Sequence, residues 1–261
     1  MHSILAVLVI LEWQFSTPDY FEESISILRN DYTMVIGDGK VEATITATNF
    51  DANARVRDTL HDALNDRFLG VQLLSHRPYE LSKPQVIKVH PDGHKEYFIE
   101  SKGAQITLTG GTADVRVTDK DGNIISDSKR DRIEKKRSLA ELVGAYRASD
   151  SVLRALLSSH GTAMRDPDNE LVHLYEIREG LSKRFGGEPA VKSELGIAYS
   201  DWSRIGQLCN DEALRQGRHR GKSVGGLRDA TDAELTEARA IARSMIESYL
   251  QYLDRLKGTV A

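Results

Sequence analysis

The chain has 261 residues, of which 40% are hydrophobic and 28% are charged. This balance is typical of a globular protein, and the length allows a substantial core in one large domain or two smaller ones. The formal net charge of −4 excludes a globally basic nucleic-acid-binding protein, so any such function must come from a local patch.

The first predicted element is a buried strand in the apolar run Ile4–Leu11. The run is too short to cross a bilayer, no lysine or arginine precedes it, and no small-residue cleavage site follows it. The chain has one cysteine, Cys209, so no intramolecular disulfide can form and a reducing compartment fits. We therefore expect a cytoplasmic protein with no membrane anchor.

Up to about residue 127 the sequence has the pattern of strands. The segment 23–28 alternates polar and apolar residues, as a half-buried strand does. Glycine-containing turns that predict hairpins lie at 37–39, 91–93, 110–111 and 121–122. One amphipathic helix interrupts the strands, with apolar residues at Val56, Leu60, Leu64 and Phe68.

From about residue 128 onward the sequence has the pattern of helices. The periodicity of the apolar residues predicts helices that include 139–146, 152–157, 171–185 and 235–256. Asp166 followed by Pro167 predicts the start of the third of these helices, and Gly186-Gly187 predicts its end. Thr231 and Glu234 form a capping box at the start of the last helix.

Together these patterns predict an α+β protein. A β-rich domain with an antiparallel sheet of about six to eight strands and one helix is expected over residues 1–127. A helical bundle is expected over 128–261, because the apolar seam of 235–256 is typical of a helix that packs against partner helices. The boundary is placed in the polar segment 127–137, which has no apolar stripe.

The segment 210–222, NDEALRQGRHRGK, concentrates basic residues around one histidine. Arg215, Arg218, Arg220 and Lys222 surround His219. Arginine binds phosphate with two parallel hydrogen bonds, and histidine exchanges a proton near neutral pH. These are the groups that metal-free RNA cleavage needs, since a base, an acid and a cation must act on the pentavalent phosphorane. A solvated basic turn between two helices is the other interpretation.

The helical half resembles a HEPN domain, a prokaryotic bundle found in toxins and antiphage proteins. The hallmark of that family is an arginine, often followed by Asn, Asp or His, and then a histidine about four to six residues further on. In this chain Gln216 follows Arg215, and three residues separate Arg215 from His219. The resemblance covers about residues 138–257.

This resemblance implies RNA as the partner, and a homodimer through the helical bundle in which both motifs line one cleft. The implied catalytic residues are Arg215, Arg218, His219 and Glu176. The implied RNA-binding residues are Arg178, Asn210, Arg220 and Lys222. Because many members of the family bind RNA or a protein without cleaving, two activities stay open. One is a metal-independent endoribonuclease in prokaryotic defence, and the other is RNA binding alone.

Two interpretations from other classes also stay open. The protein could be a non-catalytic interaction module, in which the seam 235–256 and the basic segment hold the fold and a protein partner. The segment 190–207 also resembles a helix-turn-helix, with Gly196 at the turn and Ser200 capping the second helix. Arg204 is the only basic side chain near the start of that second helix, which equips it poorly for DNA.

No metal and no cofactor are expected. His173 and Glu176 share a helix face, as in carboxylate-bridged metal sites, but no second helix with such a pair occurs. The sequence also contains no Gly-x-Gly-x-x-Gly motif, no phosphate-binding P-loop and no Gly-x-Ser-x-Gly motif. By analogy alone, we expect the β-rich half to sense a trigger such as a phage protein or a ligand.

Overall fold

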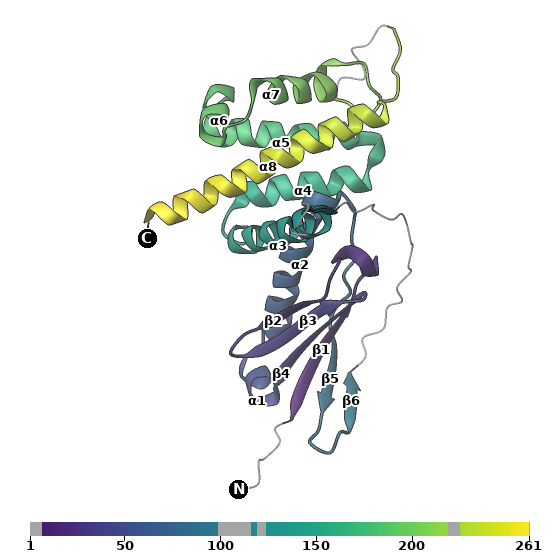
Figure 1. The fold of residues 1–261 in the computed structure, drawn as a ribbon, viewed down its shortest axis with the longest axis vertical. Helices are drawn as coiled ribbons and strands as arrows, with labels where there is room; N and C mark the ends of the chain where they lie inside the picture. Colours follow the sequence, from purple (N-terminus) through teal and green to yellow (C-terminus); the bar gives the residue numbers. More distant parts are fainter. Residues whose placement is uncertain (1–6, 99–115, 119–123, 219–224, 261) are drawn as a thin grey trace. The chain divides into compact units, whose positions relative to one another are not determined.

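The computed structural model describes residues 7–98, 116–118, 124–218 and 225–260 (Figure 1). The fold is α+β, with strands in the first half of the chain and helices in the second, as the sequence predicts. The chain divides into two compact units. The first unit contains residues 1–68 and 79–136, and the second contains 69–78 and 137–261.

A six-stranded antiparallel sheet forms most of the first unit, in the order β2-β3-β4-β1-β5-β6 (Figure 1). Two further strands, β7 and β8, form an antiparallel pair. The strands are β1 (Leu8–Gln14), β2 (Ile25–Leu28), β3 (Tyr32–Gly37), β4 (Lys40–Thr46), β5 (Gln85–Val89), β6 (Lys95–Phe98), β7 (Arg116–Thr118) and β8 (Ile124–Asp127). These described strands confirm the predicted antiparallel sheet.

Two hairpins lie where the sequence has Asp-Gly turns. Between β3 and β4, Asp38 and Gly39 have positive φ angles of 51° and 77°, which match the right-handed twist of the flanking strands. The second hairpin joins β5 to β6, and Gly93 in its turn has a φ of 86°. The turns predicted at 110–111 and 121–122 lie outside the described residues.

The sheet buries alternate residues, which explains the strand pattern of the sequence. In β1, Val9, Leu11 and Trp13 are fully shielded from solvent, and the residues between them are more exposed. The strand therefore accounts for the second half of the predicted run Ile4–Leu11, and residues 4–6 lie outside the described part.

Aromatic rings fill the rest of this core. The ring of Phe68, on α2 (Val56–Ser75), lies 5.1 Å from that of Phe15 and 4.9 Å from that of Phe21. It also stacks on Tyr20 at 5.3 Å. Val56, Leu60 and Leu64 are buried with Phe68, so the predicted apolar stripe of this helix is confirmed. The remaining short helices of the unit are η1 (Pro18–Tyr20) and α1 (Ala47–Ala52).

The second unit is a bundle of helices (Figure 1). Its helices are the end of α2, the second part of α3 (Ser128–Tyr146), α4 (Ser151–Arg165), η2 (Pro167–Asn169), α5 (Glu170–Phe185), α6 (Glu188–Leu195), α7 (Tyr199–Gly206), η3 (Gln207–Asp211) and α8 (Asp232–Val260). One continuous apolar cluster joins them, and its largest fully buried side chains are Trp202 and Tyr249. The predicted helical bundle is therefore present.

The last helix begins as its sequence predicts. The backbone N–H of Thr231 donates to Oε2 of Glu234 at 2.8 Å, and the N–H of Glu234 donates to Oγ1 of Thr231 at 3.3 Å. The predicted seam is buried as far as Leu253, whereas Leu256 is 45% exposed. The seam therefore ends one turn earlier than its sequence pattern indicates.

The division between the units falls within the predicted boundary segment 127–137, between Lys136 and Arg137 in the middle of α3. No pattern in the sequence indicated that residues 69–78 belong with the helical unit. Leu73 of this segment is part of the apolar cluster of the bundle. None of the helices in the described ranges is long and apolar enough to cross a membrane.

Two predicted caps are different in the structure. Ala198, not Ser200, is the N-cap of α7, and Ser200 lies inside the helix with its hydroxyl 3.4 Å from Asp201. Asp166 is at the predicted N-cap position before Pro167, but the element that starts there is a 3-10 turn, and α5 begins only at Glu170. The carboxylate of Asp166 accepts hydrogen bonds from the side chains of Asn169 and His173 and from no capping backbone N–H. Short polar side chains bond to whichever donor the tertiary fold supplies, so their capping role is hard to predict.

Candidate functional site

The predicted basic segment, 210–222, begins in the last residues of a π-helical turn that extends α7 over Gln207–Asp211. π-helical turns are rare in proteins, and many of those that occur lie at functional sites. Cys209 is buried in this turn, and burial raises the pKa of its thiol to about 12. Asn210, a predicted RNA-binding residue, donates from Nδ2 to Oδ1 of Asp211 at 2.9 Å.

Backbone hydrogen bonds attach the described part of the basic segment to the bundle. The N–H of Val172 on α5 donates to the carbonyl oxygen of Gln216 at 3.2 Å. The N–H of Arg218 donates to the carbonyl oxygen of Cys209 at 2.9 Å. The segment therefore runs beside α5 before it reaches His219.

Arg218 is held on the surface of α5 by two side chains. Its guanidinium carbon lies 4.6 Å from the centroid of the Tyr175 ring, and its Nη1 donates to Oε1 of Glu179 at 2.8 Å. Tyr175 and Glu179 are four residues apart, so they share one face of the helix. The side chains of Arg218 and Glu179 are 33% and 42% exposed, so a ligand from solvent can reach the pair.

Arg215 is the more exposed of the two predicted arginines. Its side chain is 64% exposed, and its Nε lies 3.6 Å from Oδ1 of Asp229, which is itself 70% exposed. Its backbone N–H donates to the carbonyl oxygen of Arg228 at 3.0 Å, which fixes the main chain but not the side chain. The predicted site residues His219, Arg220 and Lys222 lie outside the described residues.

Arg178 contacts the same tyrosine and packs into the bundle. Its Nε donates to the carbonyl oxygen of Trp202 at 3.3 Å, and its Nη1 donates to the hydroxyl of Tyr175 at 3.1 Å. Its guanidinium carbon lies 4.5 Å from the Trp202 ring. These contacts join α5 to α7, so Arg178 has a packing role whatever it binds.

Glu176 belongs to a different polar group on α5. Its Oε2 accepts a hydrogen bond from Oγ of Ser159 at 2.8 Å and lies 3.7 Å from Nδ1 of His173. Nε2 of His173 lies 3.1 Å from Oδ2 of Asp166. His173 thus stands between two carboxylates, and its hydrogen bond with Asp166 lowers the pKa of that carboxyl group. The structure therefore brings Arg218 and Arg178 to one ring, and places Glu176 with Ser159 and His173.

The residue that the DNA-binding interpretation needs is engaged in ion pairs. Nε of Arg204 lies 3.0 Å from Glu237, and its Nη1 lies 3.1 Å from Glu212. Arg228 also pairs with Glu212 at 2.9 Å and with Glu234 at 2.6 Å. This network neutralises the positive charge at the end of α7, which weakens the case for a recognition helix.

A second group of ionisable residues lies inside the bundle. Glu170 is only 2% exposed, and its carboxylate accepts hydrogen bonds from Nε and Nη2 of Arg239 at 2.5 and 2.6 Å. Nε2 of His76, at the end of the segment 69–78, lies 3.4 Å from the same carboxylate. The ring of His160 lies 5.4 Å from that of His76 and is 1% exposed.

Burial controls the charge state of this internal group. Nε2 of His160 and Nδ1 of His76 are buried, with no hydrogen-bond partner among the described residues. Burial lowers the pKa of His160 to about 3, and the nearby charges of His76 and Arg243 act in the same direction. Burial alone would raise the pKa of Glu170, but the hydrogen bonds from Arg239 and His76 outweigh it and lower the pKa. At neutral pH a neutral His160 therefore lies beside an ionised Glu170.

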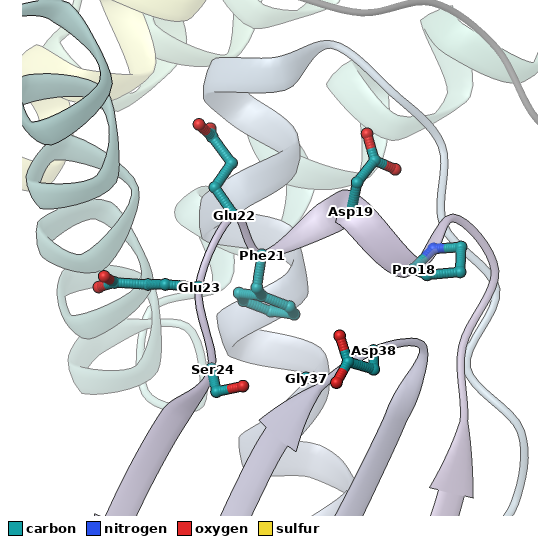
Figure 2. Close-up of a pocket in the computed structure, with 8 residues that line it drawn as sticks. All are labelled: Pro18, Asp19, Phe21, Glu22, Glu23, Ser24, Gly37 and Asp38. Carbon is teal, nitrogen blue, oxygen red and sulfur yellow. The ribbon is translucent and has the colours of Figure 1, made fainter.

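The β-rich unit carries a pocket of about 350 Å³. Figure 2 shows the residues that line it, among which Asp19, Glu22, Glu23 and Asp38 are acidic. Hydrogen bonds from Arg132 and Lys136 lower the pKa of Glu22 to about 2, against the opposing effect of burial. Because acidic walls repel phosphate groups, this pocket is unsuited to RNA.

Among the described residues, no group of three or more His, Cys, Asp or Glu side chains is placed to hold a metal ion. His90 and His94 flank the β5–β6 turn with rings 5.8 Å apart, and His90 pairs with Glu96. These three side chains are not placed so that they could hold one metal ion together.

Sequence reasoning missed the residues that surround the predicted ones. Tyr175 lies three residues before Arg178, and Glu179 lies one residue after it, yet neither stood out as a partner for the basic segment. The helical spacing of Tyr175 and Glu179 was the available signal. Nothing local in the sequence indicates that His76, His160 and Glu170 meet, because His76 follows α2, His160 lies on α4 and Glu170 begins α5.

Comparisons of the chain with protein-family models, with curated proteins and with solved structures find no match.

Proposed function

We propose that the helical unit is HEPN-like and that it binds RNA through the basic segment. The observation that carries the proposal is the placement of Arg218 over the Tyr175 ring, in the same segment as the exposed side chain of Arg215. An arginine set on an aromatic ring keeps its N–H groups directed outward, as phosphate binding requires. Arg178, Asn210, Arg220 and Lys222 are proposed to extend the contact with RNA.

The proposed activity is metal-independent cleavage of the bound RNA. His219 would act as acid or base, and Arg215 or Arg218 would stabilise the charge on the phosphorane. Glu176 is proposed as the supporting polar residue, since it belongs to the helix to which Gln216 is bonded. A homodimer through the bundle would bring two basic segments to one cleft. Light scattering of the purified protein tests whether the dimer forms.

The experiment is an incubation of the pure protein with mixed RNA in the presence of EDTA, beside the His219→Ala variant. Products that end in a 2′,3′-cyclic phosphate and are lost in the variant establish a ribonuclease centred on His219. Absence of cleavage together with salt-sensitive RNA binding leaves an RNA-binding protein without catalysis. If the protein neither cleaves nor binds RNA, the proposal is wrong.

A second candidate function is a protein-interaction module, which the paired charges favour. Arg204, Arg218 and Arg228 each lie within 3.1 Å of a carboxylate oxygen, so much of the positive charge is neutralised inside the unit. This candidate predicts that Arg215→Ala combined with Arg218→Ala leaves RNA retention unchanged. The RNA proposal predicts that the same double variant lowers both the affinity and its dependence on salt.

A further inference from the structure

We infer that Tyr175, Arg218 and Glu179 form a phosphodiester-binding site in which the Glu179 carboxylate occupies the place of the RNA phosphate. The inference rests on the proposed function and identifies the atoms that would receive the backbone of the RNA. It also assigns Glu179 a role that sequence reasoning did not give it, as an internal competitor of the ligand.

The geometry gives Arg218 a fixed orientation before any ligand binds. Tyr175 is 9% exposed, and its hydroxyl accepts a hydrogen bond from Arg178 at 3.1 Å, so the ring is a rigid support. The guanidinium group of Arg218 lies over this ring at 4.6 Å. Its main chain is held at the same time by the hydrogen bond from its N–H to the Cys209 carbonyl oxygen. Little side-chain freedom remains to be lost on binding.

The single hydrogen bond between Arg218 and Glu179 has the length expected for a contact between arginine and an anionic oxygen. Nη1 donates to Oε1 at 2.8 Å, within the range of charge-assisted N–H···O bonds. A carboxylate and a phosphodiester each present anionic oxygens to a guanidinium group, and arginine binds both in the same way. Glu179 therefore satisfies the donor that RNA would use.

The exposure of the pair allows the exchange. Both side chains reach solvent, and an exposed ion pair contributes little to stability, so Glu179 can rotate away at small cost. If Glu179 only held the basic segment in place, loss of its carboxylate would loosen the segment and weaken RNA binding. The two roles of Glu179 thus predict changes of opposite sign.

The test compares Glu179→Gln with Glu237→Gln for binding of mixed-sequence single-stranded RNA in EDTA at one fixed salt concentration. Glu237 is a matched control, because it also pairs with an arginine in this unit and the exposed fractions are similar, at 33% and 45% for Arg204 and Glu237. Removing one negative charge is common to both variants. We expect Glu179→Gln to lower the dissociation constant about five-fold and Glu237→Gln to change it less than about two-fold.

A double-mutant cycle completes the test. In an Arg218→Ala background, Glu179→Gln is expected to have no effect, because the competing carboxylate then has no donor to mask. Equal binding by the native protein and Glu179→Gln, weaker binding by the variant, or an unchanged gain in the Arg218→Ala background would overturn the inference while RNA binding stands. If no variant binds RNA, the proposed function is wrong and the inference with it.

Discussion

At the scale of single residues, two arginines share one tyrosine but differ in what they support. Arg178 donates hydrogen bonds to the Trp202 carbonyl and the Tyr175 hydroxyl, and its side chain is 21% exposed. Arg218 makes an exposed ion pair with Glu179. The first arginine therefore belongs to the packing between α5 and α7, and the second is available to a ligand.

This difference predicts unequal costs on removal. We expect Arg178→Ala to lower the free energy of unfolding by about 1–3 kcal/mol, because a carbonyl and a hydroxyl lose their donors and a ring loses its cation. Arg218→Ala should cost less than about 1 kcal/mol, as exposed ion pairs do. Urea denaturation of the two variants measures both values, and equal losses would contradict the distinction.

The internal group of Glu170, His76 and His160 predicts a dependence of stability on pH. The pKa of His160 is about 3 in the folded protein, below its ordinary value of 6.5, so the unfolded chain binds the proton first. This contribution to stability is present in full above pH 6.5 and is lost as the pH falls towards 3. The lowered pKa of Glu170 acts in the same direction at more acid pH.

We expect His160→Leu to flatten the pH profile of the free energy of unfolding between pH 6.5 and 4.5. One proton contributes a slope of up to about 1.4 kcal/mol per pH unit, and the variant removes it. His90→Leu, which removes a partly exposed histidine of the other unit, is the control for loss of an imidazole. An unchanged slope in His160→Leu would show that His160 is not the titrating group.

The candidate site could be predicted from the sequence only as a set of residue types. The sequence concentrates arginines around a histidine within residues 215–222, and this combination indicated phosphate chemistry. That Glu179 neutralises Arg218 depends on the path of the basic segment beside α5, which no local pattern encodes. Glu170 was missed because an acidic residue at a helix start is ordinarily a solvated partner of the helix dipole, whereas here it is buried against Arg239.

At the scale of helices, Gly70 on α2 marks a close approach to α3. A Cβ atom at this position would lie 2.5 Å from the backbone nitrogen of Ala140, which is far inside contact distance. Alanine is the better helix former by about 1 kcal/mol, but a clash with backbone cannot be relieved by rotating a side chain. The clash therefore outweighs the gain in helix propensity and decides the sign of the change in the free energy of unfolding.

We expect Gly70→Ala to destabilise the protein by about 1–3 kcal/mol, as overpacking of a well-filled core does. Gly161→Ala on α4 is the matched control, since its Cβ would meet its nearest atom, Oε1 of Gln72, at 3.4 Å, an ordinary contact. The control should be neutral or slightly stabilising. Thermal unfolding of both variants tests this, and a stable Gly70→Ala would mean that the two helices can move apart.

Helices and hairpins were largely predictable, because their signals are local. The capping box of Thr231 and Glu234 and the turn at Asp38-Gly39 place hydrogen bonds and positive φ angles where these residues favour them. The cap predicted at Ser200 was wrong, because the N-cap of α7 lies two residues earlier, at Ala198. Several polar residues near a helix start are equivalent in sequence, and tertiary contacts choose between them.

At the scale of the whole molecule, the helical unit is discontinuous in sequence. Residues 69–78 belong to it together with 137–261, and they supply Leu73 to its core and His76 to the Glu170 group. A fragment cut at the predicted boundary, 128–261, lacks this segment. The predicted α+β fold class is confirmed, but a discontinuous unit cannot be recognised from composition or periodicity along the chain.

We expect the fragment 128–261 to unfold at a lower urea concentration than the helical unit of the full chain. Loss of Leu73 alone should cost about 2–5 kcal/mol, as removal of a buried leucine does, and Glu170 also loses its neighbour His76. Circular dichroism during urea unfolding compares the two. A fragment as stable as the intact chain would show that residues 69–78 add nothing to the bundle.

The reactivity of the single thiol of the chain can report on local opening of the basic segment. Cys209 is buried, and its carbonyl oxygen accepts the N–H of Arg218, so a reagent can reach the sulfur only when the chain opens locally. The rate of labelling by a small alkylating reagent then measures how often the segment leaves its place beside α5. Any ligand that fastens Arg218 would slow this reaction, without need of a reporter group attached to the protein.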